Sequence, residues 1–325
     1  MEPEKPRQGV IRTPDKRFAN LPGFDFEPHY QFIDGLRIHY LDEGPPDGEP
    51  ILLMHGEPSW CYLYRKMIPP LVQAGHRVIA PDLLGFGRSD KFISKRSYSY
   101  QLQVDLMTRL VQELDLQGIT TFVQDWGGLI GLRVVAEEPQ RFARIIAANT
   151  GFPQAPGWQG FIGKYLFRWQ VWKEGRVGTE ISWDDITLTR WVAFTRQAQL
   201  FPVGEIIQRA TVSHLPDDIM AAYDAPFPDE RYKAGARIMP SLIPTQLAVN
   251  HEAWKQVLTK WQKPFLTAFS DSDPITRKGD LIFRRYVPGA KKQPHAVILG
   301  AGHFLQEDKG EDLAQVTLDF IQNTP

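Results

Sequence analysis

The sequence contains little cysteine, no long apolar run and almost no net charge. Cys61 is the single cysteine in 325 residues, which excludes an intramolecular disulfide and a cysteine-cluster metal site and favours a reducing compartment, the cytoplasm. The 37 Lys and Arg residues balance 38 Asp and Glu residues, so no field of one sign exists to attract nucleic acid or an acidic membrane. No apolar stretch approaches the roughly 20 residues of a membrane-spanning helix. These absences predict a globular protein with no nucleic-acid or membrane partner.

Motifs that bind common cofactors are also missing. The sequence has no glycine-rich phosphate loop for a nucleotide, and its eight histidines show no spacing typical of a zinc site. We therefore expect no metal and no cofactor. Residues 1–17 are rich in charge and proline rather than apolar, which is unlike a secretory signal and predicts an extended segment lying over the core.

Short apolar or β-branched runs alternate with longer helix-like segments along most of the chain. This alternation is typical of parallel strands joined by helices, and the Asp34-Gly35 turn predicts that the first two strands form an antiparallel hairpin. The predicted strands are residues 30–33, 36–40, 51–54, 77–80, 120–124, 145–148, 265–269 and 296–299. We expect an α/β fold with an eight-stranded, mostly parallel sheet flanked by helices.

The alternation stops between residues 152 and 232, where no convincing strand is found. We expect a helical cap domain over residues 152–232, inserted into a main domain formed by residues 1–151 and 233–325. Five of the nine tryptophans fall in the insert: Trp158, Trp169, Trp172, Trp183 and Trp191. Their number predicts helices whose aromatic faces pack onto the main domain.

A strand, a tight turn of small residues and a helix succeed one another around the Asp-Trp-Gly-Gly sequence at residues 125–128. This segment resembles the nucleophile elbow of the α/β-hydrolase fold, with Asp125 where most members carry serine and Val123 where most carry glycine. Asp-Trp-Gly-Gly is characteristic of the haloalkane dehalogenases, and similarity to that family covers most of the chain. The resemblance implies that Asp125 is the nucleophile. A carboxylate is ionised near neutral pH and can attack a saturated carbon directly, whereas serine must first lose a proton.

Attack by a carboxylate leaves an ester on the enzyme, and hydrolysis of that ester needs a base to activate water. His303 follows the last predicted strand, at the position of the base in the family. The acid that orients the base should follow the preceding strand, where residues 270–274 offer Asp271 and Asp273. We choose Asp273, because its spacing from the strand matches the family, and expect Asp271 to be a solvated turn residue or a helix cap.

Residues 55–60 resemble the His-Gly-x-Pro turn of the family. By that resemblance, the backbone N–H groups of Glu57 and Trp126 form the oxyanion hole that stabilises charge during ester hydrolysis. We expect the Glu57 side chain to be a buried carboxyl bonded to backbone or water, and His55 to be structural.

A halide leaving inside an apolar cavity needs fixed N–H donors, which indole provides. The resemblance implies that Trp126 is the first halide-binding residue. In the subgroup whose acid follows the late strand, the second is a tryptophan of the insert. Trp191 matches that pattern best, and Trp169 and Trp172 are the alternatives.

The resemblance therefore implies hydrolytic conversion of a haloalkane to an alcohol, a halide and a proton. The expected partners are a small apolar halogenated substrate, halide ion and water, and the chain is expected to be a monomer or a weak homo-oligomer. The main alternative is an epoxide hydrolase, which shares the fold, the aspartate and the histidine–acid pair but uses cap tyrosines, here Tyr165 and Tyr223. A fluoroacetate dehalogenase would carry arginine in place of Trp126. A non-catalytic binding protein would usually lack a member of the triad.

Overall fold

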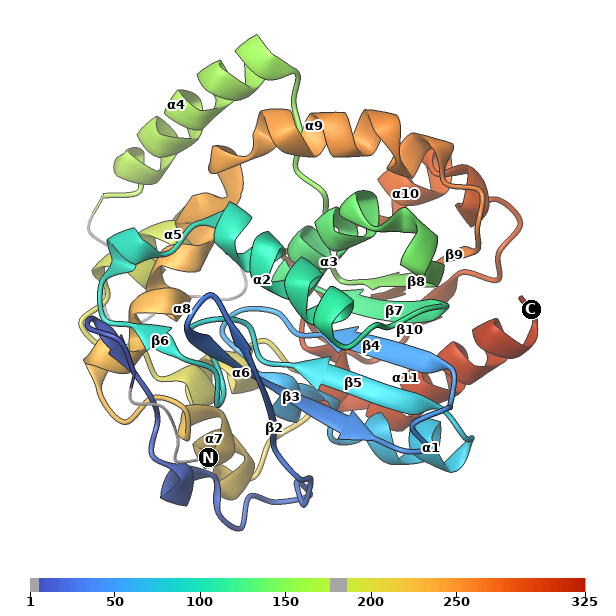
Figure 1. Ribbon diagram of the computed structural model, residues 1–325. Helices are drawn as coiled ribbons and strands as arrows, with labels where there is room; N and C mark the ends of the chain where they lie inside the picture. The colour runs from blue at the N-terminus through green and yellow to red at the C-terminus, as the bar shows by residue number, and fades with distance from the viewer. Residues whose placement is uncertain (1–5, 176–185, 325) are drawn as a thin grey trace.

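A twisted eight-stranded sheet forms the centre of the molecule (Figure 1). The computed structural model describes residues 6–175 and 186–324. The strands of this sheet are β2 (His29–Ile33), β3 (Leu36–Glu43), β4 (Pro50–Met54), β5 (Arg77–Pro81), β7 (Ile119–Gln124), β8 (Phe142–Ala148), β9 (Phe265–Ser270) and β10 (Ala296–Ile298). Each predicted strand is present, and none of its ends differs by more than three residues from the prediction.

The strand order is β10-β9-β8-β7-β4-β5-β3-β2. The six strands from β10 to β5 are parallel, and β3 and β2 add an antiparallel hairpin at one edge. The central parallel strands β4, β7 and β8 are almost wholly buried, and each contains a continuous apolar run. Their carboxyl ends meet at one edge of the sheet, which is where open α/β sheets bind ligands. The predicted α/β-hydrolase fold is confirmed.

Helices cover both faces of the sheet. The α-helices outside residues 152–232 are α1 (Ile68–Gln73), α2 (Tyr100–Glu113), α3 (Trp126–Glu137), α8 (Ala234–Ile238), α9 (Leu247–Gln256), α10 (Asp280–Tyr286) and α11 (Leu305–Gln322). Helices α2, α3 and α9 lie over one face, and α1 and α11 lie over the other (Figure 1). Helix α2 shows why these segments are helical: Ser99 caps the first turn through the N–H of Leu102 at 3.0 Å, and Val104, Met107 and Val111 fall on one buried face.

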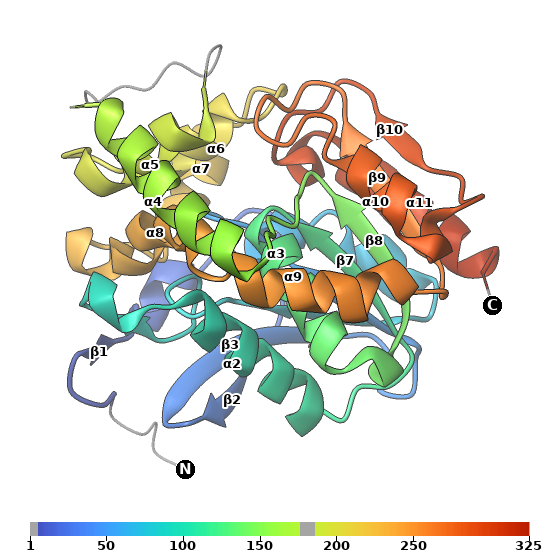
Figure 2. The same ribbon diagram turned by 90° about the horizontal axis from the view of Figure 1, so that it is seen from above.

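The described part of residues 152–232 contains four α-helices and no strand. They are α4 (Gly157–Lys173), α5 (Leu188–Gln197), α6 (Val203–Arg209) and α7 (Asp217–Asp224). Seen from above in Figure 2, they gather at one end of the sheet. The 3-10 helix η6 (Met239–Thr245) lies beside α4 and α5 as the chain returns to the main domain.

The predicted packing of the insert tryptophans is wrong for three of them. Trp191 is buried, but Trp158, Trp169 and Trp172 are 50% to 74% exposed, and Trp183 lies outside the described residues. The reason is the face that α4 turns inward. Gly160 approaches Leu247 so closely that a Cβ atom would lie 3.3 Å from the leucine Cβ, so small residues make the contact and the aromatic face turns to solvent.

The N-terminal segment is an extended strap, which includes a strand that the sequence did not reveal. Strand β1 (Val10–Ile11) pairs with β6 (Lys91–Phe92) in a separate two-stranded sheet. Arg12 then binds the buried Asp90 at 2.6 Å, and the hydroxyl of Thr13 donates to the carbonyl of Pro226 at 2.6 Å. The strap therefore ties the main domain to the end of the insert.

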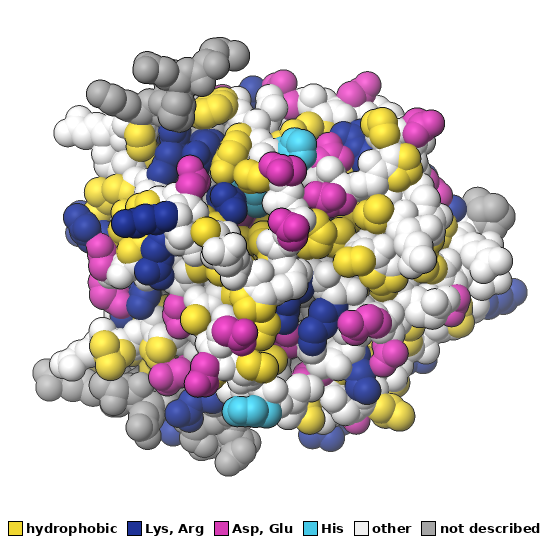
Figure 3. Space-filling model, turned by 90° about the horizontal axis from the view of Figure 1, so that it is seen from below, with side chains coloured by type: hydrophobic (Ala, Val, Ile, Leu, Met, Phe, Trp, Pro, Cys, Tyr) yellow, Lys and Arg dark blue, Asp and Glu magenta, His cyan; other side chains and the backbone are white. Residues whose placement is uncertain are grey.

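The surface of the described residues agrees with the balanced composition. Acidic and basic side chains are interspersed over the face shown in Figure 3. No helix among the described residues is both long and apolar enough to cross a bilayer.

Candidate active site

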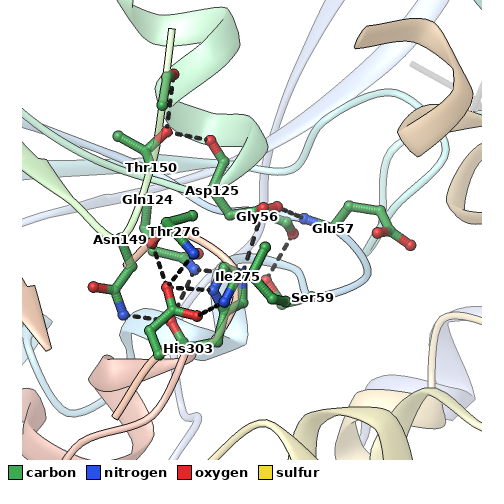
Figure 4. A network of polar contacts seen from close by, with 12 residues as sticks. Gly56, Glu57, Ser59, Gln124, Asp125, Asn149, Thr150, Ile275, Thr276 and His303 are labelled. Carbon is green, nitrogen blue, oxygen red and sulfur yellow. Dashed lines mark hydrogen bonds and ion pairs between the residues drawn. The ribbon is translucent and has the colours of Figure 1, made fainter. Parts of the chain in front are cut away.

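Asp125 lies at the sharp turn between β7 and α3. Its backbone has φ 51° and ψ −123°, a conformation that is strained for a residue with a side chain. Two neighbours hold it there: the Asp125 N–H donates to the carbonyl of Asn149 at 3.1 Å, and the hydroxyl of Thr150 donates to the Asp125 carbonyl at 2.7 Å. Figure 4 shows the bond between Thr150 and Asp125. The turn lifts the carboxylate clear of the sheet edge.

Glycine is required at two consecutive positions after this turn. A Cβ atom on Gly127 would lie 2.0 Å from the carbonyl oxygen of Met54, and one on Gly128 would lie 2.0 Å from the hydroxyl of Thr150. Packing also explains why valine fits at position 123, where most members of the fold carry glycine. The Val123 side chain packs against Gly131 of α3, and a Cβ on Gly131 would lie only 2.8 Å from a Val123 methyl group. Glycine at position 131 therefore makes room for the valine.

The structure brings Asp125, His303 and Asp273 together from the loops after β7, β10 and β9. Nε2 of His303 lies 3.4 Å from Oδ2 of Asp125, and Nδ1 of His303 lies 3.0 Å from Oδ2 of Asp273. His303 and Asp273 are buried. Asp271 is exposed instead and accepts the N–H of Gly300 at 3.0 Å, so it stabilises the turn before the histidine.

The electrostatics of this group follow from burial and charge. Burial lowers the pKa of His303, but the carboxylates of Asp273 and Asp125 outweigh burial and raise it to about 10. Burial likewise acts to raise the pKa of Asp273, but His303 and the hydrogen bonds from Thr276 and Ile275 lower it overall. The resting site therefore contains an imidazolium between two carboxylates.

Two further polar residues position the histidine, and sequence reasoning missed both. The amide of Asn149 donates to the carbonyls of Gly302 and His303 at 2.9 and 3.1 Å, and the amide of Gln124 donates to the His303 carbonyl at 3.1 Å. The available signal was an amide side chain at the end of each of two apolar strands. From the insert, the Ala210 carbonyl accepts the His303 N–H at 2.7 Å.

The residues predicted for the oxyanion hole face the Asp125 carboxylate. The N–H of Glu57 donates to Oδ1 of Asp125 at 2.8 Å. Trp126 is the first residue of α3, so its N–H has no acceptor within the helix. Gly56 is required beside them, because a Cβ there would lie 2.4 Å from the Cβ of Asp125. His55 bonds the carbonyl of Gly56 and accepts the N–H of Leu83, which fits a structural part.

The Glu57 side chain differs from the expectation. It is buried, and its Oε2 accepts the indole N–H of Trp191 at 3.2 Å, rather than bonding backbone. Burial and the negative charge of Asp125 raise the pKa of Glu57 well above its usual value. The Glu57 side chain therefore connects the predicted oxyanion hole to Trp191, the tryptophan expected to bind halide.

A cavity of about 40 Å³ lies over the Asp125 carboxylate. Residues of α5, α6, η6 and the loops after β4, β7, β9 and β10 line it: Glu57, Pro58, Asp125, Trp126, Leu188, Trp191, Ile206, Pro240, Ile243, Ile275, His303 and Phe304. Most of these side chains are apolar. The alternatives Trp169 and Trp172 are exposed on α4 and do not line it. The cavity therefore suits a small, weakly polar molecule.

One group among the described residues has metal-ligating atoms close together: His39, Cys61 and Asp82, all buried. The carboxylate of Asp82 already accepts His39 Nδ1 at 2.7 Å and the N–H groups of Cys61 and Arg88 at 2.9 and 2.8 Å. These donors account for the buried charge, so the group is a structural network beneath the site.

Comparison with known proteins agrees with this geometry. A family model described as alpha/beta hydrolase fold matches residues 49–310. The haloalkane dehalogenase of Psychrobacter cryohalolentis is 50% identical over 97% of this chain and 99% of its own, and that of Mycolicibacterium paratuberculosis is 45% identical over 96% and 98%. Among solved structures, the tetrameric haloalkane dehalogenase of Paraglaciecola agarilytica has a TM-score of 0.80 and 32% identity, covering 95% of this chain and 98% of its own. With the nucleophile elbow and the cavity above it, these matches establish that the chain belongs to the haloalkane dehalogenases of the α/β-hydrolase fold.

Proposed function

We propose that this enzyme hydrolyses small haloalkanes through an ester on Asp125. The observation that carries the proposal is the setting of the Asp125 carboxylate. One oxygen accepts the N–H of Glu57, the other faces Nε2 of His303, and the indole of Trp191 lines the same apolar cavity. A nucleophile, a base and halide donors thus surround one small space.

In the first step, Oδ2 of Asp125 attacks the carbon that bears the halogen. The new C–O bond forms as the carbon–halogen bond breaks, and its electron pair leaves with the halide. Oδ1 stays on the N–H of Glu57 and becomes the carbonyl oxygen of the ester. The indole N–H groups of Trp126 and Trp191 receive the halide without adding a strongly hydrated charge.

In the second step, water hydrolyses the ester. Alkylation removes the Asp125 charge, which is one of the charges that raise the pKa of His303, so the imidazolium can release its proton to solvent. Neutral His303 then takes a proton from water as water attacks the carbonyl, and the backbone N–H groups of Glu57 and Trp126 stabilise the oxyanion. Departure of the alcohol restores Asp125. The sum is alcohol, halide and one proton.

The contacts of the cap tyrosines argue against an epoxide hydrolase. That chemistry needs tyrosine hydroxyls at the cavity to protonate the epoxide oxygen. Tyr165 is exposed on α4, and the hydroxyl of Tyr223 donates to Glu307. Neither residue lines the cavity.

Three further assignments accompany this proposal, on the cap, the cellular location and self-association. We assign residues 152–232 as the cap, because α5 and α6 roof the cavity. A cytoplasmic location fits the single, buried Cys61. Self-association is also proposed, since the relative from Paraglaciecola agarilytica is a tetramer.

Halide release from 1-bromobutane and 1,2-dibromoethane tests the function directly. The wild type should release halide, Asp125→Ala should release none, and the control Asp271→Asn should keep activity because Asp271 is exposed and the amide oxygen can still accept the N–H of Gly300. Conversion of styrene oxide to its diol without any halide release would instead support the epoxide alternative.

A further inference from the structure

The carboxyl group of Glu57 has one oxygen with no partner. Glu57 is 4% exposed and lines the cavity beside Asp125 and Trp191. Its Oε2 accepts the indole N–H of Trp191 at 3.2 Å, whereas Oε1 is buried without a hydrogen-bond partner among the described residues. Leaving such an atom unsatisfied is unfavourable, because it loses its bonds to water without gaining others. An orphan polar atom that lines a ligand cavity therefore points to a ligand that completes it.

The charge of the carboxyl group follows from its neighbours. Two ionisable groups face Glu57, namely Asp125 and His303. The Glu57 backbone already binds the Asp125 carboxylate, and His303 is shared between Asp125 and Asp273. A second anion in this apolar space would be unfavourable, so Glu57 is a neutral acid. Its carbonyl oxygen is the better acceptor and takes the indole N–H, which leaves the proton on Oε1.

We propose that Glu57 is a third halide ligand: its carboxylic O–H at Oε1 donates to the halide, beside the indole N–H of Trp126 and the indole N–H of Trp191, which the halide then shares with Oε2 of Glu57. A neutral acid donates as an indole does, without a hydrated charge. This inference rests on the proposed function, because it needs halide to bind in this cavity.

Bromide titrations followed by tryptophan fluorescence test it without turnover. Glu57→Gln keeps an acceptor for Trp191 and an N–H donor, so bromide affinity should stay within about threefold of the wild type. Glu57→Leu removes both, and affinity should fall about 10- to 100-fold, the range of one hydrogen bond to a charged group. Equal affinity in wild type and Glu57→Leu would overturn the inference alone. No bromide binding by the wild type would overturn the proposed function as well.

A double-mutant cycle separates direct contact from mere support of Trp191. In the Trp191→Phe background, Trp126 still reports binding, and Glu57 can no longer act through the indole. A further loss of affinity on adding Glu57→Leu supports a direct ligand. No further loss shows that Glu57 only positions Trp191.

A second inference concerns α4, at the outer rim of the cap in Figures 1 and 2. Seven large apolar side chains of this helix are 47% to 74% exposed: Trp158, Phe161, Ile162, Tyr165, Leu166, Trp169 and Trp172. At roughly 100 Å² each, about half of a buried aromatic side chain, they expose roughly 700 Å². Monomeric proteins rarely expose an apolar patch larger than a few hundred Å². A standard interface buries about 800 Å² per partner.

These side chains form a stripe along α4, and their spacing favours another helix as the partner. Residues 158, 162, 165, 169 and 172 are separated alternately by four and three positions, which is the seam of two packed helices. Two of the three cations of α4 lie beside this seam, and the third packs against the ring of a seam residue. Lys164 and Arg168 line a groove on the side of η6, and Nζ of Lys173 lies 4.0 Å from the centre of the Trp169 ring. Trp158 and Trp172 lie seven positions on either side of Tyr165, so the stripe can pair with itself in an antiparallel arrangement.

We infer that α4 binds α4 of a second copy in an antiparallel pair, with the two-fold axis at Tyr165. Self-pairing around an axis makes every contact occur twice, as in other isologous dimers. Trp158 then lies opposite Trp172 of the partner subunit, and Tyr165 lies opposite Tyr165 of the partner subunit.

Disulfide crosslinking tests whether the two-fold axis lies at Tyr165. Cys61 is buried, so Tyr165→Cys provides the one accessible thiol and should form a disulfide-linked dimer on mild oxidation. Leu281→Cys on α10, with similar exposure, should stay monomeric on a denaturing gel. Equal crosslinking of the two variants, or none, contradicts the axis.

Light scattering after gel filtration tests the surface. The wild type should have at least twice the chain mass of 37.1 kDa. Tyr165→Glu with Trp172→Glu should halve the mass and keep halide release, whereas Leu281→Glu should change neither. A monomeric wild type overturns the inference, and so does flotation of that monomer with anionic vesicles, which would assign the stripe to a membrane surface.

Discussion

Asp273→Asn removes the charge behind the base and keeps its shape. In the wild type, Oδ2 of Asp273 lies 3.0 Å from Nδ1 of His303, and the pKa of His303 is raised to about 10 despite burial. Asp273 makes the largest of the contributions that raise it. With a neutral amide there, the pKa of His303 should fall, and the imidazolium that forms as water attacks should be less stable.

The expected magnitude differs between the two chemical steps. Loss of the orienting acid in comparable triads slows the base-dependent step by about 10²- to 10⁴-fold, which corresponds to about 3–5 kcal/mol in its barrier. Attack by Asp125 does not use His303 as a base. Rapid mixing of Asp273→Asn with 1-bromobutane should therefore give a burst of one halide per active site, followed by slow release.

Two results would refute this reasoning. Unchanged steady-state turnover would show that Asp273 does not support the base, and a burst slowed as much as the steady state would show that His303 takes part in the first step. The matched control is Asp271→Asn, which changes an exposed acid two residues away and should behave as the wild type.

Further predictions concern stability and the elbow. Glu307→Gln leaves the buried Arg65 without its anion, so the free energy of unfolding measured in urea should fall by about 3–5 kcal/mol. The double variant Arg65→Met with Glu307→Leu should largely restore it. A fall below about 1 kcal/mol in Glu307→Gln would contradict this reasoning. Gly128→Ala places a methyl group against Thr150 and should abolish halide release, and an active variant would refute the close approach. Because the folded-state pKa of His303 is about 10 and its unfolded value about 6.5, its stabilising contribution is complete below pH 6.5 and is lost as the pH rises through 10. Wild-type unfolding free energy should therefore fall across that window relative to His303→Phe, and parallel curves would contradict it.

The sequence predicted those parts of the fold that have local causes. The six parallel strands contain short apolar runs, and the Asp34-Gly35 turn marked the antiparallel hairpin, so all eight strands were found. Asp125 stands out because a strand, small residues and a helix follow one another in the chain. Asp271 and Asp273 both follow β9, and the local sequence alone does not separate them. The structure separates them, because only Asp273 contacts His303.

The parts that depend on distant contacts were not predictable. Asn149 meets the His303 loop across more than 150 residues of chain, and Arg12 meets Asp90 across 78. The aromatic residues of α4 did not reveal which face of the helix is buried. That face is set by the close approach of Gly160 to Leu247, which are far apart in the chain.

Mass spectrometry of His303→Phe after exposure to 1-bromobutane tests the covalent step most directly. The elbow geometry leaves Asp125 able to attack, while the variant has no base to activate water. The protein should gain the mass of one butyl group, carried by the peptide that contains Asp125. Unmodified protein, or a butyl group on any other residue, would contradict an ester on Asp125.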